Sequence, residues 1–168
     1  MSMKVAHRSY WEISETVFGI PFLIGIGMQL AAPLSLPQGV LRQALIPVGA
    51  ACLVVGVSFV VLARREFARY GQPTDPGLPT SKVVTTGVFS ASRNPLYLGV
   101  VGALIGVALT LNAFWVLVML APAIVLCHYV LIAPEERYLA AKFGEEYTMY
   151  AMSVRRWFGR RRPIERWH

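Results

Sequence analysis

The chain has 168 residues, enough for one domain, and 55% of them are hydrophobic while only 15% are charged. This balance is far more apolar than that of an ordinary soluble domain, so we expect lipid to surround much of the chain. The formal charge of +7 does not indicate nucleic-acid binding, because the basic residues lie at the ends of apolar segments rather than along one solvated face.

The first half of the chain predicts two membrane spans. Residues 13–32 carry no charge after Glu15, and their length is about the 20 residues that a bilayer core requires. Residues 44–63 carry no charge at all and are followed by Arg64, whose side chain can extend into the lipid headgroups. We expect the N-terminus to be retained, because no convincing signal cleavage site follows the first apolar run.

The next segment, residues 66–94, is polar and rich in proline and glycine, above all at residues 72–79. Such a composition predicts a loop rather than a continuous helix. A loop of nearly thirty residues is long enough to have a function of its own.

Residues 95–133 form an uncharged stretch that is too long for one span. Leu111 and Asn112 offer the only plausible turn near its middle. We therefore predict a helical hairpin with spans at residues 95–110 and 113–132.

Small residues punctuate these apolar runs. Gly99, Gly102 and Gly106 recur at helical spacing, so they share one face and would let another helix approach closely. Cys52 and Cys127 both lie inside apolar runs, which favours packing roles over a disulfide framework or a zinc site, and we expect no bound metal.

The distribution of positive charge predicts the orientation. Fifteen of the sixteen lysines and arginines fall in the N-terminal arm, the segment from Arg64 to Asn94 and the tail from Pro134, and the sixteenth is Arg42. Positive charge marks the cytoplasmic side, so both termini and the long loop should face the cytoplasm, in a bacterial inner membrane. The predicted fold is one all-α integral membrane domain over residues 1–168, with about four transmembrane helices and a C-terminal helical tail that lies at the interface.

Three groups of residues come together at the cytoplasmic edge of this arrangement: residues 85–89, residues 92–99 and residues 134–144. An ordered set of motifs runs through them: Gly87-x-Phe89, Arg93-Asn94-Pro95-x-Tyr97-x-Gly99, Glu135-Glu136-x-x-Leu139 and Phe143-Gly144-x-x-Tyr147-x-x-Tyr150. Over residues 83–154 this set resembles the superfamily of isoprenylcysteine carboxyl methyltransferases and phospholipid N-methyltransferases.

The resemblance implies an enzyme that binds S-adenosylmethionine in a pocket formed by the loop, the start of the third span and the acidic end of the fourth, with the tail as a cap. The cofactor-binding residues that it implies are Gly87, Phe89, Arg93, Asn94, Pro95, Tyr97, Leu98, Gly99, Glu135, Glu136 and Tyr147. Among these, we expect Arg93 and Glu136 to act in catalysis. Asn94 stands where the eukaryotic isoprenylcysteine enzymes have histidine, and asparagine cannot take a charge.

The chemistry of these side chains is compatible with that expectation. Methyl transfer from a sulfonium needs acceptor, methyl and sulfur in line, so positioning can supply much of the catalysis. Glu135 and Glu136 can accept hydrogen bonds from cofactor hydroxyls, or can pair with Arg93 or Arg137 as a helix cap. The planar fork of Arg93 suits a carboxylate, or serves as a membrane anchor. Tyr147 can close over the cofactor or lie at the lipid interface.

Several alternatives remain open at this point. The acceptor is a membrane lipid or another lipophilic molecule: a phospholipid amine, an isoprenylcysteine-like carboxylate or a thiol. A membrane reductase of the steroid-reductase type, with a nicotinamide cofactor, has a similar tail, although no phosphate-binding glycine loop is evident. A four-span transporter or scaffold is the non-enzymatic alternative. The glycine face permits a homo-oligomer without requiring one.

Overall fold

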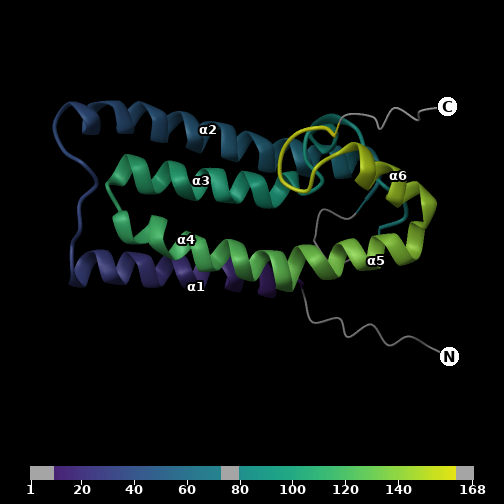
Figure 1. Ribbon diagram of the computed structural model, residues 1–168, viewed down its shortest axis with the longest axis horizontal. Helices are drawn as coiled ribbons and strands as arrows, with labels where there is room; N and C mark the ends of the chain where they lie inside the picture. Colours follow the sequence, from purple (N-terminus) through teal and green to yellow (C-terminus); the bar gives the residue numbers. More distant parts are fainter. Residues whose placement is uncertain (1–9, 73–79, 162–168) are drawn as a thin grey trace.

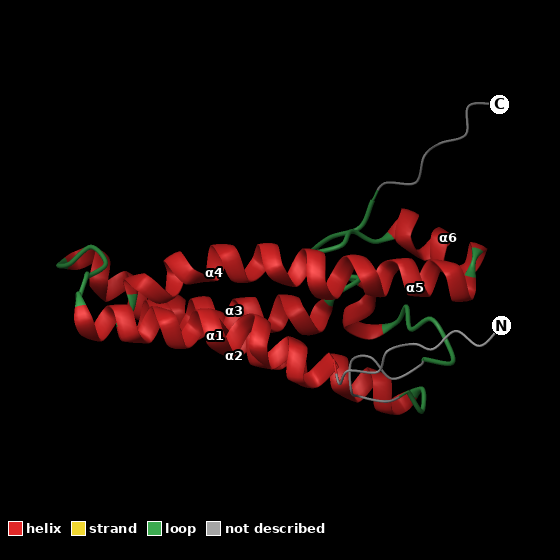
Figure 2. Ribbon diagram, turned by 90° about the horizontal axis from the view of Figure 1, so that it is seen from below, coloured by secondary structure: helices red, strands yellow, loops and turns green. Residues whose placement is uncertain are grey.

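The computed structural model describes residues 10–72 and 80–161, and this part of the chain is all-α, as expected (Figure 2). Strand-like pairing among the described residues is confined to an isolated bridge between Val154 and Arg160. The elements are α1 (Tyr10–Ala31), α2 (Val40–Arg69), the 3-10 helix η1 (Gly87–Ser90), α3 (Pro95–Leu111), α4 (Phe114–Leu126), the π-helical segment η2 (Cys127–Ile132), α5 (Ala133–Phe143) and α6 (Glu145–Ser153).

The four long helices form two pairs that run side by side (Figure 1). One pair is α2 with α3, and the other is α1 with α4. The connections between α1 and α2 and between α3 and α4 lie at one end of the bundle, whereas η1, α5 and α6 gather at the other end (Figure 1). The candidate residues therefore come together at a single end of the molecule.

Glycines make the close contact between α2 and α3. A Cβ atom at Gly106 would lie 2.4 Å from the backbone nitrogen of Leu53, and one at Gly99 would lie 2.6 Å from the carbonyl oxygen of Gly56. Only residues without a side chain permit this approach of two backbones. The prediction that the glycine face of the third span receives another helix is confirmed.

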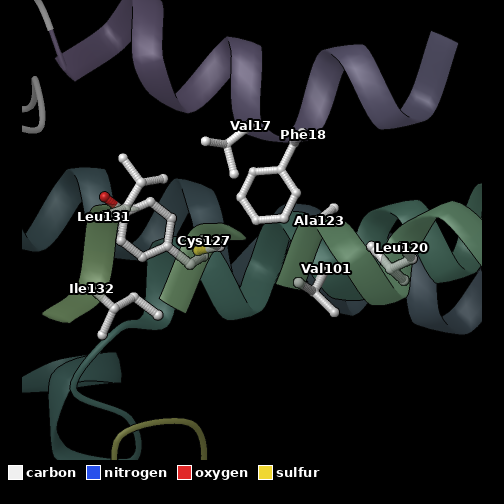
Figure 3. Close-up of a cluster of buried hydrophobic side chains, with 9 residues drawn as sticks. Val17, Phe18, Val101, Leu120, Ala123, Cys127, Leu131 and Ile132 are labelled. Carbon is white, nitrogen blue, oxygen red and sulfur yellow. The ribbon is translucent and has the colours of Figure 1, made fainter. Parts of the chain in front are cut away.

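The main hydrophobic core joins α1, α3, α4 and η2 and extends from within the bundle to the end that holds α5. Val17 and Phe18 point from α1 toward Ala123 and Cys127 on the α4–η2 helix (Figure 3). In the π-helical segment η2 the hydrogen bonds run from residue i to residue i+5, so it has more residues per turn than the α-helix on either side, and Leu131 within it is fully buried. The sequence pattern did not predict this change of helical period.

Polar contacts stabilise the end of the bundle that carries the α1–α2 and α3–α4 connections. Asn112 ends α3 in the left-handed conformation (φ 59°), and its side-chain oxygen accepts a hydrogen bond of 2.9 Å from the backbone of Leu36. Arg42 donates to the carbonyl oxygens of Leu109 and Thr110 at the C-terminus of α3, where a positive charge is favoured. The predicted turn at residues 111–112 is thus confirmed, and Arg42 has a structural role.

The expected number of spans is confirmed only in part. Among the described residues, two helices are long and apolar enough to cross a membrane, Val40–Arg69 and the continuous helix Phe114–Phe143. The apolar parts of the other two, Glu15–Ala31 and Pro95–Leu111, have 17 residues or fewer. Spans formed by α1 and α3 therefore stay a prediction.

The prediction that the loop begins at Glu66 is wrong. Helix α2 continues to Arg69, because Glu66 is buried there and its carboxylate accepts a hydrogen bond from the hydroxyl of Thr86. The predicted loop also contains η1, and most of its proline-rich stretch, residues 73–79, lies outside the described residues.

Candidate active site

An ion-pair cluster occupies the centre of the candidate site. The carboxylate of Glu136, in the first turn of α5, lies 3.2 Å from Nη1 of Arg93 and 2.6 Å from Nη2 of Arg156. Nε of Arg156 adds a hydrogen bond of 3.0 Å, so this arginine holds the carboxylate with two parallel contacts. The side chain of Glu136 is only 14% exposed. Charge-assisted, bidentate pairing of this kind offsets the cost of keeping the carboxylate out of water.

Arg93 immediately precedes the N-cap of α3 and keeps an unused hydrogen-bonding group. Its side chain is 8% exposed, and Nη1 also reaches the hydroxyl of Tyr147 in α6 at 3.5 Å. Nε of Arg93 is buried and has no hydrogen-bond partner within the described part of the chain. A buried donor without a partner costs about 1–3 kcal/mol, so a ligand oxygen that accepts this N–H would be favoured.

Tyr147 closes the cluster from α6. Its side chain is buried, and this burial raises the pKa of Tyr147 to about 12, with the charge of Glu136 acting in the same direction. The hydroxyl therefore stays protonated at neutral pH and can donate a hydrogen bond, but it cannot act as a base. The hydrogen bond to Glu136 raises the pKa of Arg156 above its usual value, which keeps this guanidinium charged.

A second polar contact lies beside the cluster. Tyr97, in the first turn of α3, is 4% exposed, and its side chain is hydrogen-bonded to Glu135. Glu135 and Glu136 are adjacent in α5, yet they contact different partners. The first carboxylate is held by a neutral hydroxyl, and the second is held by two guanidinium groups.

The tail folds back on the segment before α3. The backbone nitrogen of Arg93 donates to the carbonyl oxygen of Arg155 at 3.1 Å, and Nδ2 of Asn94 donates to that of Arg156 at 3.1 Å. Ser92 is completely buried, and its hydroxyl oxygen accepts a hydrogen bond of 3.1 Å from the backbone of Asn94. These contacts place Arg156 against Glu136.

The turn that leads into the site is supported by α2. Gly87 has a φ of 57°, and a Cβ atom at this position would lie 2.9 Å from the carboxylate of Glu66. Phe89 is buried, its ring lies 4.9 Å from that of Phe67, and its carbonyl oxygen accepts a hydrogen bond of 2.8 Å from the hydroxyl of Tyr150. Glu66 and Tyr150 thus fix the position of η1.

The structure brings together some of the predicted site residues and separates others. Arg93, Glu136 and Tyr147 form the cluster, with Tyr97 and Glu135 beside it. Gly87, Phe89, Asn94 and Pro95 shape the turn and the start of α3. Gly99 lies against α2, where its lack of a side chain serves helix packing, and the half-buried Leu98 makes no polar contact through its apolar side chain.

Three residues at the site were missed by the sequence analysis. Arg156 was placed in the interfacial tail without a role at the site, Ser92 had no assigned role, and Glu66 was placed in a loop. Arg156 reaches the site only because the tail reverses direction after Val154. The one available signal was Glu66, an acidic residue among the basic and apolar residues that follow the second span.

The arrangement combines a half-buried pair of carboxylates, two guanidinium groups and two tyrosine hydroxyls at one end of an apolar helical bundle. No group of three or more potential metal-ligating side chains is found in residues 10–72 and 80–161. Fold and site together define an α-helical membrane protein with a polar, partly enclosed site at one end.

Comparison with known families identifies the class of enzyme. The model of the phospholipid methyltransferase family matches residues 45–146, which is more than half of the chain and includes Arg93, Glu135 and Glu136. The chain therefore belongs to the phospholipid methyltransferase family, whose members are membrane methyltransferases. No curated protein and no solved structure matches the chain significantly.

Proposed function

We propose that this protein transfers a methyl group from S-adenosylmethionine to a lipophilic acceptor at the cytoplasmic ends of α3 and α4. The family match over residues 45–146 supports a methyltransferase, and the buried, unpartnered Nε of Arg93 is the observation that carries the proposal. An oxygen of a bound cofactor is a suitable acceptor for this N–H group.

The residues of the site fit the charges of such a cofactor. S-adenosylmethionine, when bound, supplies a methyl group on a positively charged sulfur, and its methionyl end carries a carboxylate. The guanidinium of Arg93 suits that carboxylate. Glu136 offers oxygens to ribose hydroxyls or to the amino group, while Arg156 holds it in place.

Glu135 is the better candidate for proton removal. If the acceptor is an amine, a base has to take its proton as the new bond to carbon forms and the bond from carbon to sulfur breaks. Glu136 is engaged by two guanidinium groups, whereas the described partner of Glu135 is the hydroxyl of Tyr97. Tyr97 keeps the Glu135 carboxylate at the junction of α3 and α5.

Binding of the cofactor is the direct test. Calorimetric titration of the purified protein with S-adenosylmethionine and S-adenosylhomocysteine should give micromolar dissociation constants, with a nicotinamide cofactor as the negative control. Arg93→Ala and Glu136→Gln should weaken binding at least tenfold, because each removes a charge-assisted contact of about 1.5–3 kcal/mol.

Matched control variants separate the site from the overall charge of the chain. Arg65→Ala and Glu146→Gln change exposed residues of the same types that lie outside the cluster, and both should bind as the wild type does. Absence of binding by the wild type, in detergent and again in lipid nanodiscs, would disprove the proposal. Wild-type affinity in both Arg93→Ala and Glu136→Gln would remove these residues from the site.

A further inference from the structure

The chain reverses direction tightly after α6 instead of continuing as an interfacial helix. Val154, directly after this helix, forms the antiparallel bridge with Arg160. The backbone nitrogen of Arg155 donates to the carbonyl oxygen of Gly159 at 2.8 Å, which closes the turn between them. We call residues 153–161 the tail reversal.

The tail reversal has a buried face and a charged face. Neighbouring side chains of an extended chain point to opposite faces, so Arg155 and Arg161 share the face opposite to Val154. Val154 is buried in a cluster with side chains of α6, whereas both arginines are exposed. The backbone of Arg161 donates to Ser153 at 2.9 Å, which places the two arginines diagonally across the pair, about 7–8 Å apart. Gly159, opposite Arg155, adds no side chain to this face.

Two aromatic side chains at the tip of the reversal lie in different surroundings. Trp157 is half-buried and packs against the main hydrophobic core. Its neighbour Phe158 is 64% exposed. An exposed phenyl ring together with exposed arginines is typical of a segment that lies at a membrane interface, because the ring can enter the boundary of the acyl chains while the guanidinium groups stay among the headgroups.

Backbone hydrogen bonds fix the tail reversal beside the start of α3. The nitrogen of Gly159 donates to the carbonyl oxygen of Ala91 at 2.7 Å, and the nitrogen of Arg93 donates to that of Arg155 at 3.1 Å. Both contacts lie within four residues of Pro95, where α3 begins. In the membrane arrangement predicted from the sequence, the start of α3 is level with the cytoplasmic headgroups, where anionic lipids make the surface negative. The exposed arginines therefore lie at the depth of the charges that they complement.

We propose that the tail reversal is a docking surface for the anionic phospholipids of the bilayer, and that docking holds Arg156 against Glu136. Arg156 lies between the exposed residues Arg155 and Phe158 and pairs with the carboxylate at 2.6 Å. Lipid that immobilises the exposed side chains therefore also immobilises the guanidinium at the candidate active site. The reversal follows residues 45–146, which match the family model. The docking surface does not rest on the proposed function, but its effect on cofactor binding does.

A fluorescent dye at the tip measures docking without any cofactor. In the full-length protein without Cys52 and Cys127, a nitrobenzoxadiazole label on Phe158→Cys should emit at shorter wavelength in nanodiscs that contain phosphatidylglycerol than in nanodiscs of phosphatidylcholine alone. The reason is that docking moves the dye into the apolar layer. Equal emission in the two lipids would overturn the proposal. A shift of the same size when heparin is added to phosphatidylcholine nanodiscs would assign the surface to a soluble polyanion and overturn it as well.

Two double substitutions identify the charges that are responsible. Arg155→Gln with Arg161→Gln should abolish the lipid-dependent shift, while the backbone contacts of the reversal stay in place. Arg65→Gln with Arg137→Gln removes two exposed arginines of α2 and α5 and should keep the shift. Loss of the shift in both double variants would show that it follows the net charge of the chain, and a full shift without Arg155 and Arg161 would show that another surface meets the lipid. Either result would contradict the proposal.

Titration with S-adenosylmethionine tests the link to the active site. The dissociation constant of the wild type should be about fivefold lower in nanodiscs with phosphatidylglycerol than in phosphatidylcholine alone, at the lower end of typical coupling between two sites. Neither lipid carries an amine that could accept a methyl group, so no transfer interferes. Arg155→Gln with Arg161→Gln should bind equally in both. Equal wild-type affinities would overturn the coupling, whereas lipid-dependent emission without any cofactor binding would refute the methyltransferase function alone.

Discussion

The two adjacent carboxylates of α5 illustrate how neighbouring residues acquire different chemistry from their partners. Glu136 is held by Arg93 and Arg156, and every one of these contacts lies between 2.6 and 3.2 Å. Glu135 contacts Tyr97, which also lines an apolar pocket between α1, α2 and α3. A carboxylate between two guanidinium groups is well placed to hold a ligand, and one beside a neutral hydroxyl is better placed to take a proton.

Removal of the Glu135 charge should therefore slow the chemical step. With a phospholipid amine as acceptor and saturating S-adenosylmethionine, Glu135→Gln should lower kcat by about 100-fold or more, because positioned general bases contribute about 10²–10⁴-fold. The measurement is transfer of labelled methyl to lipid. Glu146→Gln, at an exposed position of α6, should keep the wild-type kcat. A wild-type kcat in Glu135→Gln would assign proton removal to another group.

At the residue scale, the sequence predicted which residues form the site better than it predicted the contacts between them. Arg93, Glu136 and Tyr147 were predicted from motifs, and their side chains do meet. Arg156 could not be predicted, because its place depends on hydrogen bonds between the backbone of the tail and residues 91–94. The contacts from Arg93 to Arg155 and from Gly159 to Ala91 join backbone atoms only, so they do not depend on side-chain identity and leave little trace in a single sequence.

At the scale of helices, the contact between α2 and α3 depends on the absence of side chains. Gly49, Gly56, Gly99 and Gly106 each leave less than 3.0 Å between a Cβ position and atoms of the facing helix. Gly102 differs, because its nearest neighbour would be 3.4 Å away. The two classes of glycine provide a test of which positions carry the helix contact.

Alanine substitution should separate these two classes. Gly106→Ala places a methyl group against the backbone of Leu53 and should lower the free energy of unfolding by about 1–3 kcal/mol, the usual cost of overpacking. Gly102→Ala should change it by less than about 0.5 kcal/mol. Unfolding in mixed micelles, followed by circular dichroism, measures both. Equal effects of the two substitutions would show that α2 and α3 are further apart than described.

The boundaries of the helices were predictable where the sequence marks them clearly. Pro95 at the start of α3 and Asn112 at its end are conformational signals, so the predicted hairpin is confirmed. The extension of α2 past Arg64 was missed, because Glu66 is stabilised by Thr86, which is distant in sequence. The π-helical turn at residues 127–132 depends on core packing around Cys127 and Leu131, which a periodicity analysis does not detect.

For the whole molecule, charge and hydrophobicity divide the bundle along its length. The ion-pair cluster, α5 and α6 lie at one end, and Arg42 and Asn112 close the other (Figure 1). Between the ends, many large apolar side chains of α1 and α2 are exposed, including Leu23, Val54 and Val55. An apolar surface of this extent between two polar ends is typical of a protein that lies in a bilayer.

Four membrane crossings would put positions 38 and 111 on one side and positions 82 and 152 on the other. All four side chains are exposed, and α2, α3 and α4 separate them in turn. At 1.5 Å per residue, α3 is about 26 Å long, slightly less than a bilayer core of about 30 Å, and local thinning can accommodate the difference.

With single cysteines in a background that lacks Cys52 and Cys127, a membrane-impermeant maleimide should label Gln38→Cys and Leu111→Cys in intact cells. It should label Lys82→Cys and Met152→Cys only after permeabilisation, since the positive charge on their side predicts the cytoplasm. Labelling of positions 82 and 111 from the same side would show that α3 does not cross the membrane, and the active site would then need a different position relative to the lipid.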